Sequence, residues 1–296
     1  MNPAAPEPAS RPVVALALGA GGAKGLAHIG ALEELERQGY AVGAIAGTSM
    51  GALIGGIYAM GKLDVYRDWV CQLARLDVLR LVDWTFRGGL IKGEKIIGTL
   101  RELIGDARIE ELPLAFTAVA TDIDREREVW LSRGQLFDAI RASIAIPTVF
   151  RPYLLEGRRL VDGALLNPVP VTPLIRERVD HVIAVSLDGP TGRRAPEQDA
   201  DASAGQRPGL LGRLFAHGED KPRVHEPGVL ELLTHAMDLM QSNLSRLRLA
   251  AYEPDLLIEI PRDVAATYEF YRARELIELG RQHTREALER FAERQR

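Results

Sequence analysis

The chain has a single cysteine, Cys71, among its 296 residues. One thiol cannot form an intramolecular disulfide, and it cannot build the thiolate cluster of a structural zinc site. Cys71 lies in an apolar helical pattern, so we expect a packed core thiol rather than a nucleophile. The rest of the composition, 46% hydrophobic and 26% charged, is typical of a globular protein.

The net charge of the chain is also small. The formal charge is −4, so the total predicts neither a nucleic-acid partner nor attraction to anionic lipid. The first apolar run, Val13–Leu18, is too short for the hydrophobic core of a signal peptide, and no basic region precedes it. We therefore expect a cytoplasmic protein.

Apolar strand patterns alternate with amphipathic helical patterns along the chain, without internal repeats. This alternation predicts an α/β fold, a three-layer α/β/α sandwich around a mostly parallel sheet. The expected strands are Pro12–Leu18, Pro113–Ala120, Glu128–Leu131, Arg159–Val161, Val182–Leu187 and Asp255–Ile260. The expected helices are Leu26–Gln38, Asp64–Arg75 with Asp64 as its cap, Lys92–Ile104, Gln135–Ala145, Val229–Ala251 and Tyr268–Phe291.

Two stretches fall outside this pattern. Residues 1–11 are rich in Pro and Ala and are predicted to be a disordered tail, which leaves 12–296 as one domain. Residues 189–228 are rich in Pro, Gly and charge and predict a long flexible insertion. Its apolar island Leu210–Phe215 offers an alternative, a lid or a short anchor at a membrane surface.

The stretch Val42–Gly61 combines a short strand, a turn with one serine, and a helix. Its turn, Gly47-Thr48-Ser49-Met50-Gly51, has the Gly-x-Ser-x-Gly spacing of a nucleophile elbow. Glycine at 47 and 51 lets the strand and helix pass closely, and the helix start aims N–H groups at the serine. Chance and a glycine-rich membrane helix are the alternatives, but the stretch is poor in Leu, Ile and Phe.

A glycine-rich loop, Gly19–Gly25, joins the first strand to the first helix. Such a loop exposes backbone N–H groups at a helix start and can bind an anion. Lys24 stands where a dinucleotide fingerprint needs glycine, and no hydroxyl follows Gly25 as a P-loop requires. An oxyanion hole needs only free donors, and Ser49 ends the very next strand, so both loops are expected at one edge of the sheet.

A serine nucleophile needs a base, and no histidine has the expected place on a short loop after a strand. His28 is expected to be structural, and the others precede a strand, lie in the insertion or lie within helices; they are His181, His217, His225, His235 and His283. Asp162 ends a strand and is followed by Gly163 and Ala164, small residues that permit close approach of another backbone. It is the better-placed base, with a turn-forming Asp-Gly as the alternative.

Four segments together resemble the bacterial branch of the patatin-like phospholipase family. Gly19–Leu32 resembles its glycine-rich loop and helix, Gly47–Gly51 its elbow, Arg141–Phe150 the segment before its second catalytic motif, and Asp162–Ala164 its Asp-Gly-Gly/Ala motif. Order and spacing agree from about residue 12 to residue 187, and the likeness is looser beyond. The family loop often reads Asp-Gly-Gly-Gly-x-Arg/Lys-Gly, and here Gly and Ala replace its first two residues.

The resemblance implies a Ser49–Asp162 dyad without a catalytic histidine. Ser49 would attack an ester carbonyl, and Asp162 would act as general base and later activate water. Backbone N–H groups would hold the oxyanion, and small or basic residues would support the motifs. The donors would be Gly21, Gly22 and Ala23, and the supporting residues Lys24, Gly25, Gly47, Gly51 and Gly163.

These features predict a serine hydrolase that cleaves acyl esters of phospholipid or lysophospholipid through an acyl-enzyme. Cutting a carboxylic ester needs no metal or cofactor, and the expected partners are a lipid or other acyl ester and, transiently, a membrane surface. Three alternatives stay open: a non-catalytic regulator or scaffold with the same fold, a conventional Ser-Asp-His esterase, and a phosphate-binding module that uses Gly19–Gly25.

Overall fold

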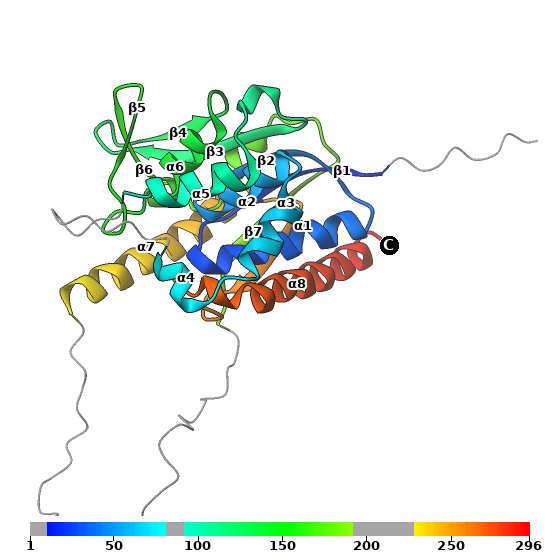
Figure 1. Cartoon of the computed structure of the whole chain (residues 1–296). Helices are drawn as coiled ribbons and strands as arrows, with labels where there is room; N and C mark the ends of the chain where they lie inside the picture. The colour runs from blue at the N-terminus through cyan, green and yellow to red at the C-terminus, as the bar shows by residue number, and fades with distance from the viewer. Residues whose placement is uncertain (1–10, 81–91, 192–227) are drawn as a thin grey trace, which may run out of the picture.

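The computed structural model describes residues 11–80, 92–191 and 228–296 (Figure 1). Within them, an eight-stranded sheet runs in the order β5-β6-β3-β2-β1-β7-β8, and β4 also pairs with β3. The strands are β1 (Val13–Leu18), β2 (Ala41–Thr48), β3 (Ala115–Asp122), β4 (Arg127–Leu131), β5 (Tyr153–Leu155), β6 (Arg158–Asp162), β7 (His181–Gly189) and β8 (Leu256–Pro261). The α-helices are α1 (Ala27–Arg37), α2 (Met50–Ala59), α3 (Leu63–Val70), α4 (Arg75–Arg80), α5 (Glu94–Ile104), α6 (Leu136–Ser143), α7 (Val229–Ala251) and α8 (Ala273–Arg294).

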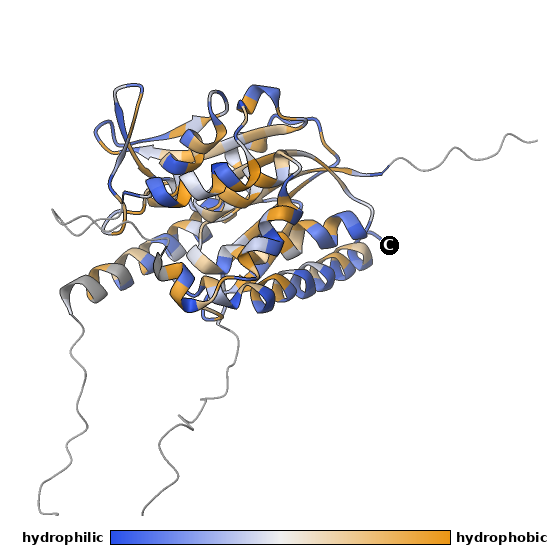
Figure 2. Cartoon of the chain, in the orientation of Figure 1, coloured by the Kyte–Doolittle hydropathy of each residue, from blue (hydrophilic) through white to orange (hydrophobic). Residues whose placement is uncertain are grey.

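The central strands are apolar throughout because both of their faces are covered. In β1, Val14, Leu16 and Leu18 face a large core shared with α1, α2, α6 and α8. The alternate residues Ala15 and Ala17 face a smaller core. Alanines suit this second face because the irregular chain around Val169–Leu174 and the end of α7 lie close against it. Figure 2 shows the apolar interior and the hydrophilic outer side of α8.

The direction of the chain changes between β1 and β7. Parallel steps from β1 to β2 and from β2 to β3 move one way across the sheet, and the step from β7 to β8 moves the other way. Right-handed crossovers then place α1 and α2 on one face and α7 on the opposite face. The loops after β1 and β7 diverge at this switch point, where open α/β sheets form their binding crevices.

Helices α1 and α8 lie side by side along one flank (Figure 1) and touch through their backbones. A Cβ on Gly30 would lie 1.9 Å from the Ile277 carbonyl oxygen, and one on Gly280 would lie 2.0 Å from that of Ala27. Glycine at both crossings is therefore a packing requirement.

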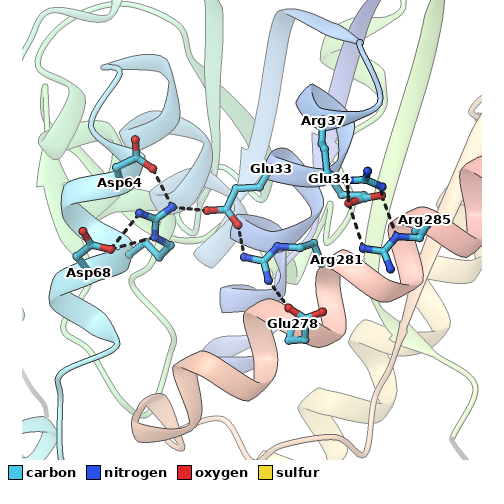
Figure 3. Close-up of polar contacts among 9 residues, drawn as sticks. Glu33, Glu34, Arg37, Asp64, Asp68, Glu278, Arg281 and Arg285 are labelled. Atoms are coloured by element: carbon cyan, nitrogen blue, oxygen red, sulfur yellow. Dashed lines mark hydrogen bonds and ion pairs between the residues drawn. The ribbon is translucent and has the colours of Figure 1, made fainter.

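Ion pairs hold the same helices at their polar edges (Figure 3). The Glu33 carboxylate bridges Arg67 of α3 and Arg281 of α8, at 2.7 and 2.5 Å. The side chain of Glu34 is fully buried and binds Arg37 and Arg285. The hydrogen bonds from Arg37 lower the pKa of Glu34 to about 2, against the cost of its burial. Glu34 thus remains ionised at neutral pH, and the ion pairs of the two carboxylates join α1, α3 and α8.

Gly280→Ala is expected to lower the free energy of unfolding by at least about 3 kcal/mol, because a methyl group cannot enter without parting α1 from α8. Gly98→Ala is the matched control, since nothing lies within 4 Å of its Cβ position in the middle of α5. That change should stabilise the protein by about 0.5–1 kcal/mol. Urea unfolding measures both changes in the free energy of unfolding. The same change in both variants would contradict the role of Gly280 in helix packing.

The sandwich with a mostly parallel sheet, predicted from the sequence, is confirmed. Two details are wrong. Asp64 does not cap α3, because the helix begins at Leu63 with Asp64 in its first turn, and it ends at Val70 instead of Arg75. The last helix begins at Ala273, after a 3₁₀ turn at Phe270–Arg272. The predicted tail (1–11, apart from its last residue) and most of the predicted insertion, including Leu210–Phe215, lie outside the described residues. No helix in the described part of the chain could cross a bilayer.

Candidate active site

Ser49 stands at a sharp turn between β2 and α2. Its backbone has φ 56° and ψ −122°, a conformation that non-glycine residues rarely adopt. The turn depends on close passage of the chain: a Cβ on Gly51 would lie 2.0 Å from the Leu18 carbonyl oxygen. The Gly-x-Ser-x-Gly pattern therefore forms the elbow that its spacing predicts.

Asp162 lies beside Ser49 because two strands, β2 and then β6, pair in turn with the same edge of β3. β2 pairs with β3 up to Thr48↔Val119. β4 covers the other edge of β3, so β6 must pair with β3 on the edge where β2 has ended. The partner of Asp162 is Ala120, one residue beyond Val119. The last residue of β6 thus arrives where β2 turns away into α2.

The two side chains meet directly. The Ser49 hydroxyl donates a hydrogen bond to Asp162 Oδ2 at 2.6 Å, and Oδ1 accepts one from the Ala164 N–H at 2.8 Å. Both residues are 3% exposed. Burial raises the pKa of Asp162 to about 6, and the bonds from Ser49 and Ala164 oppose that rise. A carboxyl group with this pKa is half ionised at about pH 6 and mostly ionised at neutral pH, which suits a general base.

The glycine-rich loop follows β1 and borders the same edge of the sheet. The Gly19 and Ala20 N–H groups bond to the carbonyls of Val185 and Pro168, which fix the start of the loop. The Ala23 N–H donates to the Thr267 carbonyl at 2.9 Å. In this conformation Ala23 is therefore engaged elsewhere, which corrects the expected set of three donors. The N–H groups of Gly21 and Gly22 are the other two members of that expected set.

A family model described as patatin-like phospholipase matches residues 16–175. That span is more than half of the chain and contains the glycine-rich loop, Ser49 and Asp162. This chain belongs to the patatin-like phospholipase family. An uncharacterized NTE family protein of Mycobacterium tuberculosis (strain ATCC 25618 / H37Rv) is 38% identical over 95% of this chain and 93% of its own length.

More distant relatives include a lysophospholipase of Kluyveromyces lactis, 27% identical over 95% of this chain. This chain spans only 19% of that protein. Among solved structures, VipD from Legionella pneumophila is similar with a TM-score of 0.45 and 13% identity, over 95% of this chain and 67% of that one.

Lys24, the basic residue of the patatin-like loop, points toward the end of β7. Its ammonium donates to the Leu187 carbonyl at 3.0 Å and lies 4.0 Å from an Asp188 oxygen. Burial lowers the pKa of Lys24, and the charge of Asp188 opposes that effect. Asp188 in turn accepts a bond from Ser245 of α7 at 2.7 Å. Lys24 thus ties the glycine-rich loop to β7 and, through Asp188, to α7.

Among the described histidines of this patatin-like chain, none forms a hydrogen bond with Ser49 or Asp162. His28 Nε2 lies 2.8 Å from the Gly19 carbonyl oxygen, and complete burial lowers the pKa of His28 to about 4. It is thus a neutral residue that supports the start of the loop. His181 packs edge-on against Phe291. His217 and His225 lie outside the described residues.

Two supports of the patatin-like site had no role in the sequence interpretation. The Thr48 hydroxyl donates to the Asn167 carbonyl at 2.8 Å and anchors the chain that follows Asp162. The Ser49 N–H donates to Ser143 Oγ at 2.9 Å. The one signal for Ser143 in the sequence is a hydroxyl among apolar neighbours, Ala142 and Ile144, at the end of a helix.

Proposed function

We propose that this chain is a serine hydrolase that releases fatty acid from phospholipid or lysophospholipid through a Ser49–Asp162 dyad. The observation that carries the proposal is the 2.6 Å bond between Ser49 Oγ and Asp162 Oδ2 in a buried site. Family membership and the name of the Kluyveromyces lactis relative support a lipid substrate.

The first half of the reaction forms an acyl-enzyme. Ser49 Oγ attacks the ester carbonyl as its proton passes to Asp162 Oδ2. The carbonyl oxygen becomes an oxyanion, held by the N–H groups of Gly21 and Gly22 at the positive end of a short helix. Collapse of this intermediate breaks the ester bond, and the leaving glycerol oxygen takes the proton from Asp162.

The second half restores the enzyme. Asp162 accepts a proton from water as the water oxygen attacks the acyl carbonyl of Ser49. The tetrahedral intermediate then releases the fatty acid, and the proton returns to Ser49 Oγ. One carboxylate serves both halves, so no histidine is required.

A transient membrane contact belongs to the same proposal. Ser245 of helix α7 hydrogen-bonds to Asp188, which lies beside Lys24 of the glycine-rich loop. Several apolar side chains of α7 are more than half exposed: Leu232, Leu239, Met240 and Leu247. Exposed apolar groups of this kind favour a lipid surface over water.

The function is tested by incubating the full chain with lysophosphatidylcholine and measuring free fatty acid. In parallel, a fluorophosphonate probe is added and the adduct is mapped by mass spectrometry. We expect fatty-acid release and an adduct on the peptide that contains Ser49. An adduct with turnover of p-nitrophenyl butyrate alone would indicate a small-ester esterase. The absence of both adduct and turnover would favour a non-catalytic regulator.

A further inference from the structure

The hydroxyl of Ser143 lies where the ladder between β2 and β3 ends. It accepts a hydrogen bond from the Ser49 N–H at 2.9 Å and donates one to the Val119 carbonyl at 2.6 Å. Thr48, directly before Ser49, is the register partner of Val119. The hydroxyl is thus inserted between the two strands at the point where the elbow leaves the sheet, and Ser143 is fully buried there.

The same segment also holds Asp162. Two residues after Ser143, the Ala145 carbonyl accepts a hydrogen bond from the Asp162 N–H at 3.0 Å. A Cβ on Gly163 would lie 2.3 Å from the Val119 carbonyl oxygen, so the Asp-Gly turn reaches the group that Ser143 binds. Residues 143–145 therefore fix the backbones of both members of the dyad.

The base of this segment is rigid. Ser143 is the last residue of α6, and that helix packs on β3, β6 and α2. Phe137, Ile140 and Ala142 of the helix are fully buried in the main core. A shift of the Ser143 hydroxyl would require α6 to move against the sheet, which close packing resists.

We propose that Ser143 is a positioning residue that sets the backbone geometry of Ser49, and so aims its Oγ at Asp162. The inference rests on the proposed function and names a further residue of the same site. Ser49 has a strained backbone, and strain persists only where the surroundings over-determine it. The bond from the Ser49 N–H to Ser143 supplies that constraint on the strand side of the turn.

Alanine at 143 would remove both bonds and leave a buried N–H and a buried carbonyl without their partner. The turn would gain freedom, and Ser49 Oγ would spend less time in line with both Asp162 and the ester carbonyl. A misplacement of about 1 Å costs about 100-fold in rate. We expect Ser143→Ala to lower kcat about 10- to 100-fold with KM within about twofold of wild type. Ser143→Cys keeps a weak hydrogen-bond donor and acceptor, so its kcat should lie between those of wild type and Ser143→Ala.

The experiment measures turnover of p-nitrophenyl butyrate per active site, with sites counted by saturating fluorophosphonate labelling of Ser49, together with its pH profile. Counting sites removes any misfolded fraction from kcat. Ser242→Ala is the matched control, because Ser242 is a buried serine whose hydroxyl has no hydrogen-bond partner in the described residues. Its kcat should equal that of wild type.

The proposal is supported if kcat per site follows wild type, Ser143→Cys, Ser143→Ala in falling order, with the midpoint of the pH profile unchanged. A kcat per site within twofold of wild type for Ser143→Ala overturns it, since the role would then be structural alone. A midpoint shifted by more than about one unit also overturns it, because the loss would then act through the charge of Asp162. A wild-type protein that forms no fluorophosphonate adduct on Ser49 and releases neither p-nitrophenol nor fatty acid would instead refute the proposed function itself.

Discussion

Ser49→Ala is expected to abolish fatty-acid release, with a loss in kcat of about 10⁶-fold. The substitution removes the oxygen that would form the acyl-enzyme, and among the described residues no other hydroxyl bonds to Asp162. The backbone donors of Gly21 and Gly22 would remain and could bind substrate without forming a covalent intermediate. Fatty-acid release from lysophosphatidylcholine and probe labelling check the result. Residual turnover above about 1% of wild type would require a different nucleophile.

A second substitution at the same position separates chemistry from strain. Ser49→Gly should be equally inactive, but glycine adopts φ 56° without the steric cost that alanine bears. We therefore expect the free energy of unfolding of Ser49→Gly to exceed that of Ser49→Ala by about 1–3 kcal/mol. The glycine variant should also unfold at a higher temperature. Equal stabilities would mean that the turn stores no strain.

The parts of the site that follow from local patterns could be predicted from the sequence. Consecutive residues form a strand, the glycine loop Gly19–Gly25 and a helix, and the same order of strand, turn and helix surrounds Ser49. Parallel strands then bring both loops to one edge of the sheet. For this reason the fold class and the neighbourhood of Ser49 required no knowledge of distant contacts.

The parts that depend on register could not be predicted in this way. Asp162 was a candidate by its place in the sequence, but its approach to Ser49 depends on β6 continuing the edge that β2 leaves. The bond from the Ala23 N–H to Thr267 joins residues far apart in the chain, and no local pattern reports it. The role of Ser143 cannot be predicted from the sequence for the same reason, because its two partners, Ser49 and Val119, lie at the ends of two different strands.

Asp162→Asn is the second large expected effect. The asparagine has the same shape; its amide oxygen can accept the bond from the Ala164 N–H, and its NH2 group can donate to Ser49 Oγ. It cannot accept the serine proton, so kcat should fall by about 10³- to 10⁴-fold. His235→Ala and His283→Ala are the controls, and both should remain within about twofold of wild type. If either histidine variant lost activity while Asp162→Asn retained it, a conventional triad would replace the dyad.

The pH dependence gives the same prediction a second readout, in stability. Burial raises the pKa of Asp162 to about 6, above its value of about 3.9 in an unfolded chain. The folded protein therefore binds this proton more tightly, and the carboxyl stabilises the fold fully only below about pH 4. That contribution is lost as the pH rises through about 6, where catalysis gains its base and kcat/KM should increase. Ionisation of the buried group thus costs about 2–3 kcal/mol of stability at pH 7.5.

Asparagine does not titrate, so Asp162→Asn should gain stability relative to wild type between pH 4 and pH 7.5 by about that amount. Urea unfolding of both proteins at the two pH values measures the change directly, and the kcat/KM profile of wild type should rise with a midpoint of about 6. A stability difference that is the same at both pH values would contradict the raised pKa, even if the variant were inactive. The active site would then keep Asp162 ionised without cost, and the energy stored in the site would have to lie in the strained turn at Ser49 alone.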